Sequence, residues 1–191
     1  MKQIRFRIKG VSPLLMHSDR LANPLDPATK AHKELTGKRK KVDTDHELIA
    51  KSEWLASLYM DDKLGPYLPG QNIDGSFAEA AKLQKLGKKF KQAVIVSEDK
   101  VPLQYKGPRD YEGMFSAGFF DIRGVKVSQA KIMRCRPKFT DWGAEFTVSF
   151  NNDVVNAEEV IKAAHDAGSL IGLCDYRPRY GKFSVEVLNG K

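Results

Sequence analysis

The chain has 191 residues, of which 41% are hydrophobic and 29% charged, so it is long and apolar enough to fold around a sizeable core. Its formal net charge of +8 favours a polyanionic partner, although lysines that serve only solubility remain the alternative. No apolar run approaches the roughly 18 residues that a membrane span needs. The N-terminal stretch MKQIRFRIKG alternates and does not resemble a signal peptide. We therefore expect a cytoplasmic protein with no membrane partner.

Cysteine and histidine are too few and too scattered for a metal centre or a disulfide framework. The two cysteines, Cys135 and Cys174, form no CxxC pair. The four histidines are His17, His32, His46 and His165, and none of them has a second metal ligand at a suitable spacing. We expect a reducing compartment, no metal and no cofactor.

Residues 3–9, QIRFRIK, alternate strictly between apolar and basic side chains. This pattern predicts a half-buried strand with Ile4, Phe6 and Ile8 on the inner face. The other face is basic throughout and supplies three candidate nucleic-acid contacts, Arg5, Arg7 and Lys9.

Residues 19–43 have no periodic pattern and include two prolines and a dense basic cluster. We expect a flexible basic insertion, with a short helix near residues 28–35. Long irregular segments inside a domain are either functional or disordered, and both interpretations stay open here. The cluster adds four candidate contacts, Lys38, Arg39, Lys40 and Lys41.

Two helices are predicted next. A capping box from Thr44 to Glu47 predicts a helix that ends near Met60 and carries Trp54, Leu58 and Tyr59. After a turn at residues 69–70, a box from Ser76 to Glu79 predicts a second helix that ends at Gly87 among several lysines.

Strand-like segments follow at residues 93–96, 101–105, 118–127, 130–136 and 144–150. Residues 138–143 have the composition of a hairpin turn between the last two of these strands. Arg134 and Arg136 share one face of their strand, as Arg5 and Arg7 do, and are further candidate contacts.

The end of the chain predicts a helix, a loop and a last strand. Asn156 and Glu159 form a capping box and Gly168 ends the helix, while Phe183, Val185 and Val187 point inward from the strand. The loop between them combines aromatic rings that can stack on bases with cations that bind phosphate. Its candidate residues are Tyr176, Arg177, Arg179, Tyr180 and Lys182. The alternative is a structural turn whose arginines pair with Asp175 and Glu186.

Without its loops, the order strand, helix, strand, strand, helix, strand predicts an α+β fold of the ferredoxin-like (RRM-like) βαββαβ type. We expect two helices to cover one face of the sheet, with a long insertion after the first strand. We expect one domain over residues 1–191.

Three local patterns resemble the RAMP superfamily of CRISPR-associated proteins, in the order found in that family and over about a quarter of the chain. Residues 67–82, YLPGQNIDGSFAEAAK, resemble the family's Pro-Gly-Ser-Ser-x-x-Gly-x-x-Arg helix start, with Glu79 or a neighbour in place of the arginine. Residues 172–188 resemble the glycine-rich loop before the last strand, with only Gly172 and Gly181 as glycines. Residues 4–18, IRFRIKGVSPLLMHS, resemble the first strand and its Pro-Leu end.

The resemblance is nearest to the backbone subunit that coats guide RNA, although this chain is shorter than those subunits usually are. It implies sequence-independent binding of single-stranded RNA or DNA, with RNA favoured, by copies that stack along the strand. Trp54, Leu58 and Tyr59 give their helix more apolar surface than one stripe needs, so they are either contacts with the next copy or core residues. Other CRISPR-type subunits are further expected partners.

Other interpretations stay open beside this one. The chain could be a stand-alone relative from a phage or other mobile element. It could be a protein-interaction module, such as a phage-encoded subunit mimic that inhibits a CRISPR complex. It could also be a RAMP-type endoribonuclease, for which His17, Asp19 and Asp26 lie in the relevant region. We assign no catalytic residue.

Overall fold

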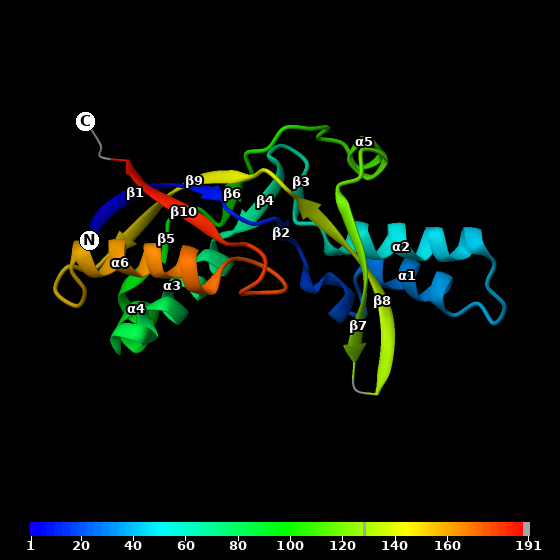
Figure 1. Cartoon of the computed structure of the whole chain (residues 1–191), viewed down its shortest axis with the longest axis horizontal. Helices are drawn as coiled ribbons and strands as arrows, with labels where there is room; N and C mark the ends of the chain where they lie inside the picture. The colour runs from blue at the N-terminus through cyan, green and yellow to red at the C-terminus, as the bar shows by residue number, and fades with distance from the viewer. Residues whose placement is uncertain (128, 189–191) are drawn as a thin grey trace. The chain divides into compact units, whose positions relative to one another are not determined.

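The computed structural model describes residues 1–127 and 129–188, and its fold is α+β with antiparallel sheets (Figure 1). The chain divides into two compact units. The first unit comprises Met1–Leu14, Met60–Lys106 and Thr140–Lys191, and the second comprises Leu15–Tyr59 and Gly107–Phe139. The sequence predicted one domain with an insertion at residues 19–43. That segment lies in the second unit, where residues 107–139 accompany it.

The first unit is built on a four-stranded sheet with the order β10-β1-β9-β5. Every neighbouring pair in this sheet is antiparallel. The strands are β1 (Lys2–Gly10), β5 (Val94–Val96), β9 (Gly143–Phe150) and β10 (Phe183–Leu188). The predicted alternation along β1 is confirmed, because Phe6 and Ile8 are buried while Arg5, Arg7 and Lys9 are exposed.

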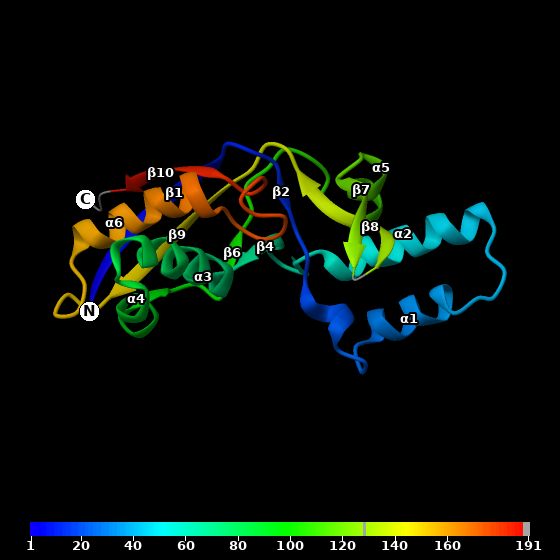
Figure 2. The same ribbon diagram turned by 60° about the horizontal axis from the view of Figure 1, so that its bottom comes forward.

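Three helices lie on one face of this sheet (Figure 2). They are α3 (Gly70–Ala81), α4 (Gly87–Ala93) and α6 (Ala157–Asp166). Phe6 of β1 meets Phe77 of α3 edge to face, with ring centroids 6.0 Å apart, and lies at the same distance from Phe146 of β9. All three rings are buried and form the centre of the core. Helix α6 begins with the predicted capping box between Asn156 and Glu159.

The start of α3 differs from the prediction. The helix begins at Gly70, directly after β4 (Gly65–Pro69), which forms a small sheet with β3 (Met60–Asp61) and β6 (Lys100–Pro102). Ser76 therefore lies inside the helix, where its hydroxyl donates to the carbonyl oxygen of Gly172 at 2.8 Å instead of capping. Gly87 does not end a helix but begins α4, after a 3-10 turn at Lys82–Gln84.

The second unit pairs two helices with a long β-hairpin. Helices α1 (Pro27–Thr36) and α2 (Asp43–Ser57) lie side by side (Figure 2). The hairpin joins β7 (Phe120–Val127) to β8 (Ala130–Phe139), and the short strand β2 (Leu14–Leu15) completes the order β2-β8-β7. A 3-10 turn at Asp19–Ala22 and helix α5 (Tyr111–Ser116) complete the unit. The segment predicted as a flexible loop thus contains α1, close to the expected short helix.

One prediction for this region is wrong, and one open alternative is decided. Strands β8 and β9 belong to different sheets, so residues 138–143 do not join a hairpin. Trp54 and Leu58 are buried, and the Trp54 indole donates to the carbonyl oxygen of Phe119 at 2.8 Å. These two side chains are therefore core residues of the second unit and are not available to another copy. No helix in the described part of the chain is long and apolar enough to span a membrane.

Candidate nucleic-acid interface

The loop between α6 and β10, residues 172–182, is held in place by its own backbone and by the segment that follows β1, residues 11–13. We call it the C-terminal loop. The N–H of Leu173 donates to the oxygen of Gly181 at 2.9 Å, and the N–H of Gly181 donates to the oxygen of Pro13 at 2.8 Å. The oxygen of Lys182 accepts from Val11 at 2.7 Å. These bonds fix both ends of the loop against the first unit.

Four residues of this loop have left-handed backbone conformations. Gly172 and Gly181 have φ values of 82° and 73°, and Cys174 and Tyr176 have values of 59° and 61°. A Cβ on Gly181 would lie 2.0 Å from the oxygen of Leu173, so only glycine fits there. Left-handed conformations at non-glycine residues cost of order 1–3 kcal/mol each, and such strain gathers at functional sites.

The loop presents the side chains that the sequence singled out. Tyr176, Arg177 and Arg179 are exposed, and Tyr180 is half-buried with its ring 5.8 Å from that of Tyr176. Within the described residues, Arg177 and Arg179 make no hydrogen bond or ion pair, so they do not form the structural turn with paired arginines. An aromatic pair beside two uncommitted guanidinium groups can stack on bases and bind phosphates.

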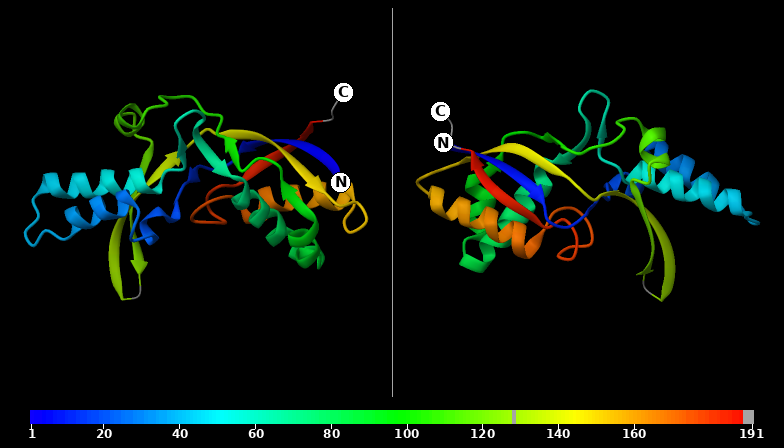
Figure 3. Two further views of the ribbon diagram at one scale, coloured as in Figure 1. Left: turned by 180° about the vertical axis from the view of Figure 1, so that it is seen from behind. Right: turned by 45° about the horizontal axis from the view of Figure 1, so that its top comes forward.

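The right-hand view of Figure 3 shows the face of the four-stranded sheet that no helix covers. This open face is less basic than the sequence indicates. Arg5 and Arg7 both bind Glu145, at 3.0 and 2.8 Å, and Arg7 also binds Glu186 at 3.0 Å. The hydrogen bond from Arg7 holds the pKa of Glu145 below its usual range, so this carboxylate is ionised at neutral pH. The ammonium of Lys9 makes no ion pair among the described residues. The acids come from β9 and β10, far away in the sequence, which is why the pattern of β1 alone did not predict them.

A hollow of about 300 Å³ lies at the end of this face, with Arg7, Lys9, Tyr105 and Lys106 in its lining. Two backbone bonds of 2.8 Å between Gln104 and Gly143 bring the segment after β6 beside the sheet. The hollow therefore combines three cations and one acid, Asp141, with a half-buried aromatic ring. Sequence reasoning missed Tyr105 and Lys106, because nothing in their local pattern indicates this pairing.

The remaining basic candidates lie in the second unit. Lys38 pairs with Asp45 at 2.6 Å, and the ammonium of Lys41 donates to the oxygen of Lys38 at 2.8 Å. Arg39 and Lys40 are exposed and make no such bond among the described residues. Residues 38–41 are called the basic loop below.

The two arginines predicted on β8, Arg134 and Arg136, contact the interior of the second unit. Arg134 binds the buried carboxylate of Glu53 at 2.8 Å, and the second oxygen of Glu53 accepts from the N–H of Cys135 at 3.0 Å. Arg136 is only 8% exposed.

The region considered for catalysis contains a helix cap. Asp26 accepts from the N–H of Ala28 at 2.8 Å and begins α1, and Arg20 binds the same carboxylate. The hydrogen bond from Arg20 is the larger cause, and the one from the N–H of Ala28 the next, of a pKa for Asp26 below its usual range. Asp19 begins the 3-10 turn, and the carbonyl oxygen of His17 accepts from the Tyr59 hydroxyl at 3.2 Å. No group of three or more His, Cys, Asp or Glu residues in residues 1–127 and 129–188 is placed to hold a metal ion.

Comparisons with known proteins add no assignment. No protein-family model matches the chain, and no curated protein matches its sequence.

Proposed function

We propose that the first unit is a ferredoxin-like βαββαβ domain that binds single-stranded nucleic acid, with RNA as the expected strand, without reading its sequence. The observation that carries the proposal is the C-terminal loop. Strained backbone and fixed ends hold Tyr176, Arg177 and Arg179 at the surface, where neither arginine has a hydrogen-bond or ion-pair partner within the described residues.

The fold assignment is supported by the strand order. Taken in chain order, β1, β5, β9 and β10 are the first to fourth strands, with α3 after the first and α6 after the third. Their spatial order is fourth-first-third-second with antiparallel neighbours, as the split βαβ arrangement requires. One face is covered by helices, which leaves the other face and its edge loops for a ligand.

The binding mode follows from the kinds of side chain present. Arginine binds phosphate through two parallel hydrogen bonds and also stacks on bases, while a tyrosine ring can stack on any base. The hollow lined by Lys9, Tyr105 and Lys106 repeats this combination at the end of the sheet. Stacking on base faces and contacts to phosphates carry no sequence information, which favours binding that tolerates any sequence.

We further propose a RAMP-like role, in which copies of the chain stack along the strand as backbone subunits and contact other CRISPR-type subunits. One copy covers only a few nucleotides, so stacking would raise the affinity for long strands. Light scattering with and without a long single strand tests this point. Complexes that grow with strand length support stacking, and a fixed monomer with equal affinity per site on long and short strands contradicts it.

The main test is the salt dependence of binding to unstructured RNA and DNA oligonucleotides. Phosphate contacts predict that the logarithm of the binding constant falls linearly with the logarithm of the salt concentration, by about 0.7 per phosphate contacted on a single strand. A flat response, or no binding at low salt, would reject the proposal. Tighter binding of RNA than of DNA would assign the natural strand.

A protein-interaction module is the second candidate, and one feature of the second unit favours it. Ile122 and Met133 are 50% and 61% exposed, and the register of β7 and β8 places them on the same face of the hairpin. Exposed apolar side chains grouped in this way are typical of protein contacts. Replacing both by serine should abolish capture of a protein partner and leave oligonucleotide binding unchanged.

A further inference from the structure

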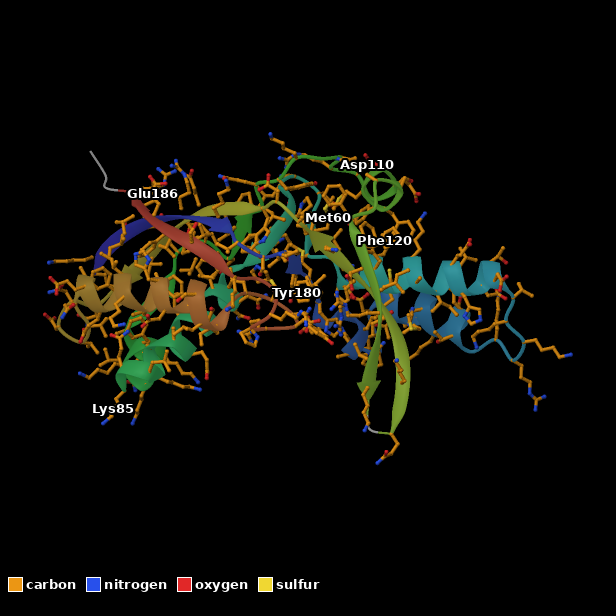
Figure 4. The ribbon with its side chains drawn as sticks, viewed as in Figure 1. Met60, Lys85, Asp110, Phe120, Tyr180 and Glu186 are labelled. Atoms are coloured by element: carbon orange, nitrogen blue, oxygen red, sulfur yellow. The ribbon has the colours of Figure 1, made fainter. Side chains whose placement is uncertain are left out.

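Four exposed lysines surround a hollow on the helical side of the first unit. The lysine patch consists of Lys82, Lys85, Lys88 and Lys91, which together with Gly87 line a hollow of about 390 Å³. In Figure 4, Lys85 is labelled on this side of the first unit and Glu186 on the opposite side. Tyr180 of the C-terminal loop is labelled at a height between them. The patch is thus separate from the open face of the sheet.

The backbone builds this hollow. Lys85 ends the 3-10 turn with a φ of 60°, which redirects the chain into α4 at Gly87. A Cβ on Gly87 would lie 2.6 Å from Cγ of Lys82, so glycine is needed for the close approach of the two segments. A left-handed lysine is an uncommon choice for a tight turn, because asparagine or glycine adopts this conformation at less cost.

The charges in the patch are mostly uncompensated. Lys82 binds Glu79, whereas Lys85, Lys88 and Lys91 make no ion pair among the described residues. Like charges gathered around one hollow repel one another, and a bound anion would relieve that repulsion. The lining contains only lysines and a glycine, with no ring for a base and no planar guanidinium, so it fits a row of phosphates rather than bases.

Glu79 connects the patch to the C-terminal loop. Its pKa is lowered first by the hydrogen bond from Lys82 and also by the charges of Arg177 and Lys91. Glu79 is therefore within electrostatic reach of one cation of the loop and two of the patch. Arg177 of the C-terminal loop and the lysine patch are therefore near one another on the surface of the first unit.

We propose that the lysine patch is a second contact for the sugar-phosphate backbone of the same single strand, which leaves the C-terminal loop and continues onto the helical side. This inference rests on the proposed function, since it extends the path of that ligand. It predicts that short strands use the loop and the sheet alone, while longer strands also reach the patch.

The test compares oligouridylates of about 4 and about 16 nucleotides, the range of site sizes known for single-strand binding folds. The variant K85Q/K88Q/K91Q should bind the short strand as the wild type does. The salt slope is the slope of the logarithm of the binding constant against the logarithm of the salt concentration. For the long strand, the magnitude of this slope should be smaller in the variant by up to about 2, because each phosphate that is no longer bound removes about 0.7. The control K2Q/K63Q/K162Q removes the same charge from three exposed lysines of the first unit outside the patch, and it should keep the full slope.

The outcomes separate the two proposals. Binding of both lengths by K85Q/K88Q/K91Q with unchanged slopes overturns the patch and leaves the proposed function standing. Failure of the wild type to bind either length overturns the proposed function itself. If polyglutamate raises the melting temperature of the wild type but not of K85Q/K88Q/K91Q, and the long strand is unaffected, the patch serves an acidic protein segment and the inference is wrong.

Discussion

The C-terminal loop and the basic loop both expose basic side chains, but they differ in structure. Residues 172–182 are bonded to the segment after β1, through Val11, Ser12 and Pro13, and their backbone is strained at Cys174 and Tyr176. Residues 38–41 connect α1 to α2 and are restrained mainly by Lys38, which binds Asp45 and whose oxygen accepts from Lys41. Both expose cations with no ion pair in the described structure.

This difference shows that a run of charge does not by itself make a site. A preorganised loop loses little conformational freedom when it binds, whereas each long side chain on a mobile segment costs about 0.5–1.5 kcal/mol to order. We therefore expect the C-terminal loop to determine affinity and the basic loop to add weaker, long-range attraction. The predictions below test this contrast, beginning with the largest effect.

Substitution of Gly181 by alanine should have the largest effect. Its Cβ would collide with the oxygen of Leu173 at 2.0 Å, and its φ of 73° is unfavourable for alanine. We expect a loss of about 1–3 kcal/mol in the free energy of unfolding, and loss of strand binding. Thermal unfolding should show a decrease of roughly 2–4 °C per kcal/mol for a chain of this length.

The matched control for this variant is Gly75→Ala in α3. No atom lies within 4 Å of the position that its Cβ would occupy, so alanine should stabilise the helix by about 0.5–1 kcal/mol. A Gly181→Ala protein as stable as the wild type would show that the loop conformation is not required.

Substitution of Tyr176 by leucine should weaken binding by about 1–3 kcal/mol, the usual value of one stacked base. Tyr176 is 41% exposed, so the loss should appear in affinity and not in stability. Leucine keeps the bulk of the side chain and removes its flat face. Titration of a fluorescent oligouridylate against both proteins measures the difference, and equal affinities would contradict a stacking role.

The double variant Arg177→Ala/Arg179→Ala should lower the salt slope by about 1.4, because two phosphates are no longer bound. The matched variant Arg39→Ala/Lys40→Ala removes the same charge from the basic loop. It should reduce the association rate more than the affinity, since solvated charges act mainly by steering. Equal losses of affinity in the two variants would remove the distinction between the loops.

Local patterns predicted the parts of the fold that neighbouring residues determine. The alternation of Ile4, Phe6 and Ile8 predicted β1, and the capping box of Asn156 and Glu159 predicted α6. In both cases the signal lies within a few residues of the feature. The exposed side chains of Tyr176, Arg177 and Arg179 were predicted in the same way.

The errors came from contacts between distant segments. Ser76 looked like a helix cap but bonds to Gly172, 96 residues away. The basic face of β1 looked uncompensated, yet Glu145 and Glu186 lie 138 and 179 residues from Arg7. Gly87 looked like a helix end, but its role is to allow close approach to Lys82. Such features depend on which segments pack together, and no local pattern carries that information.

A last prediction, which requires no change in binding, is a near absence of reaction at Cys174, and this reports whether the C-terminal loop opens. Burial raises the pKa of this thiol to about 12, against a weaker lowering by the hydrogen bond from Asn72. At pH 8 the reactive thiolate should therefore be roughly a thousandfold scarcer than in the unfolded chain, where the pKa is about 8.5. The labelling rate of Cys174 should rise tenfold per pH unit well above pH 9, because the thiol titrates only near its raised pKa.

Iodoacetamide labelling with peptide mapping distinguishes Cys174 from Cys135, whose pKa burial also raises to about 12. The control Lys40→Cys places a thiol in the basic loop, where it should react as fast as in denaturant. If Cys174 of the folded protein reacted as quickly as that control, the C-terminal loop would not protect its thiol, and the affinity of the proposed site would have to come from charge alone.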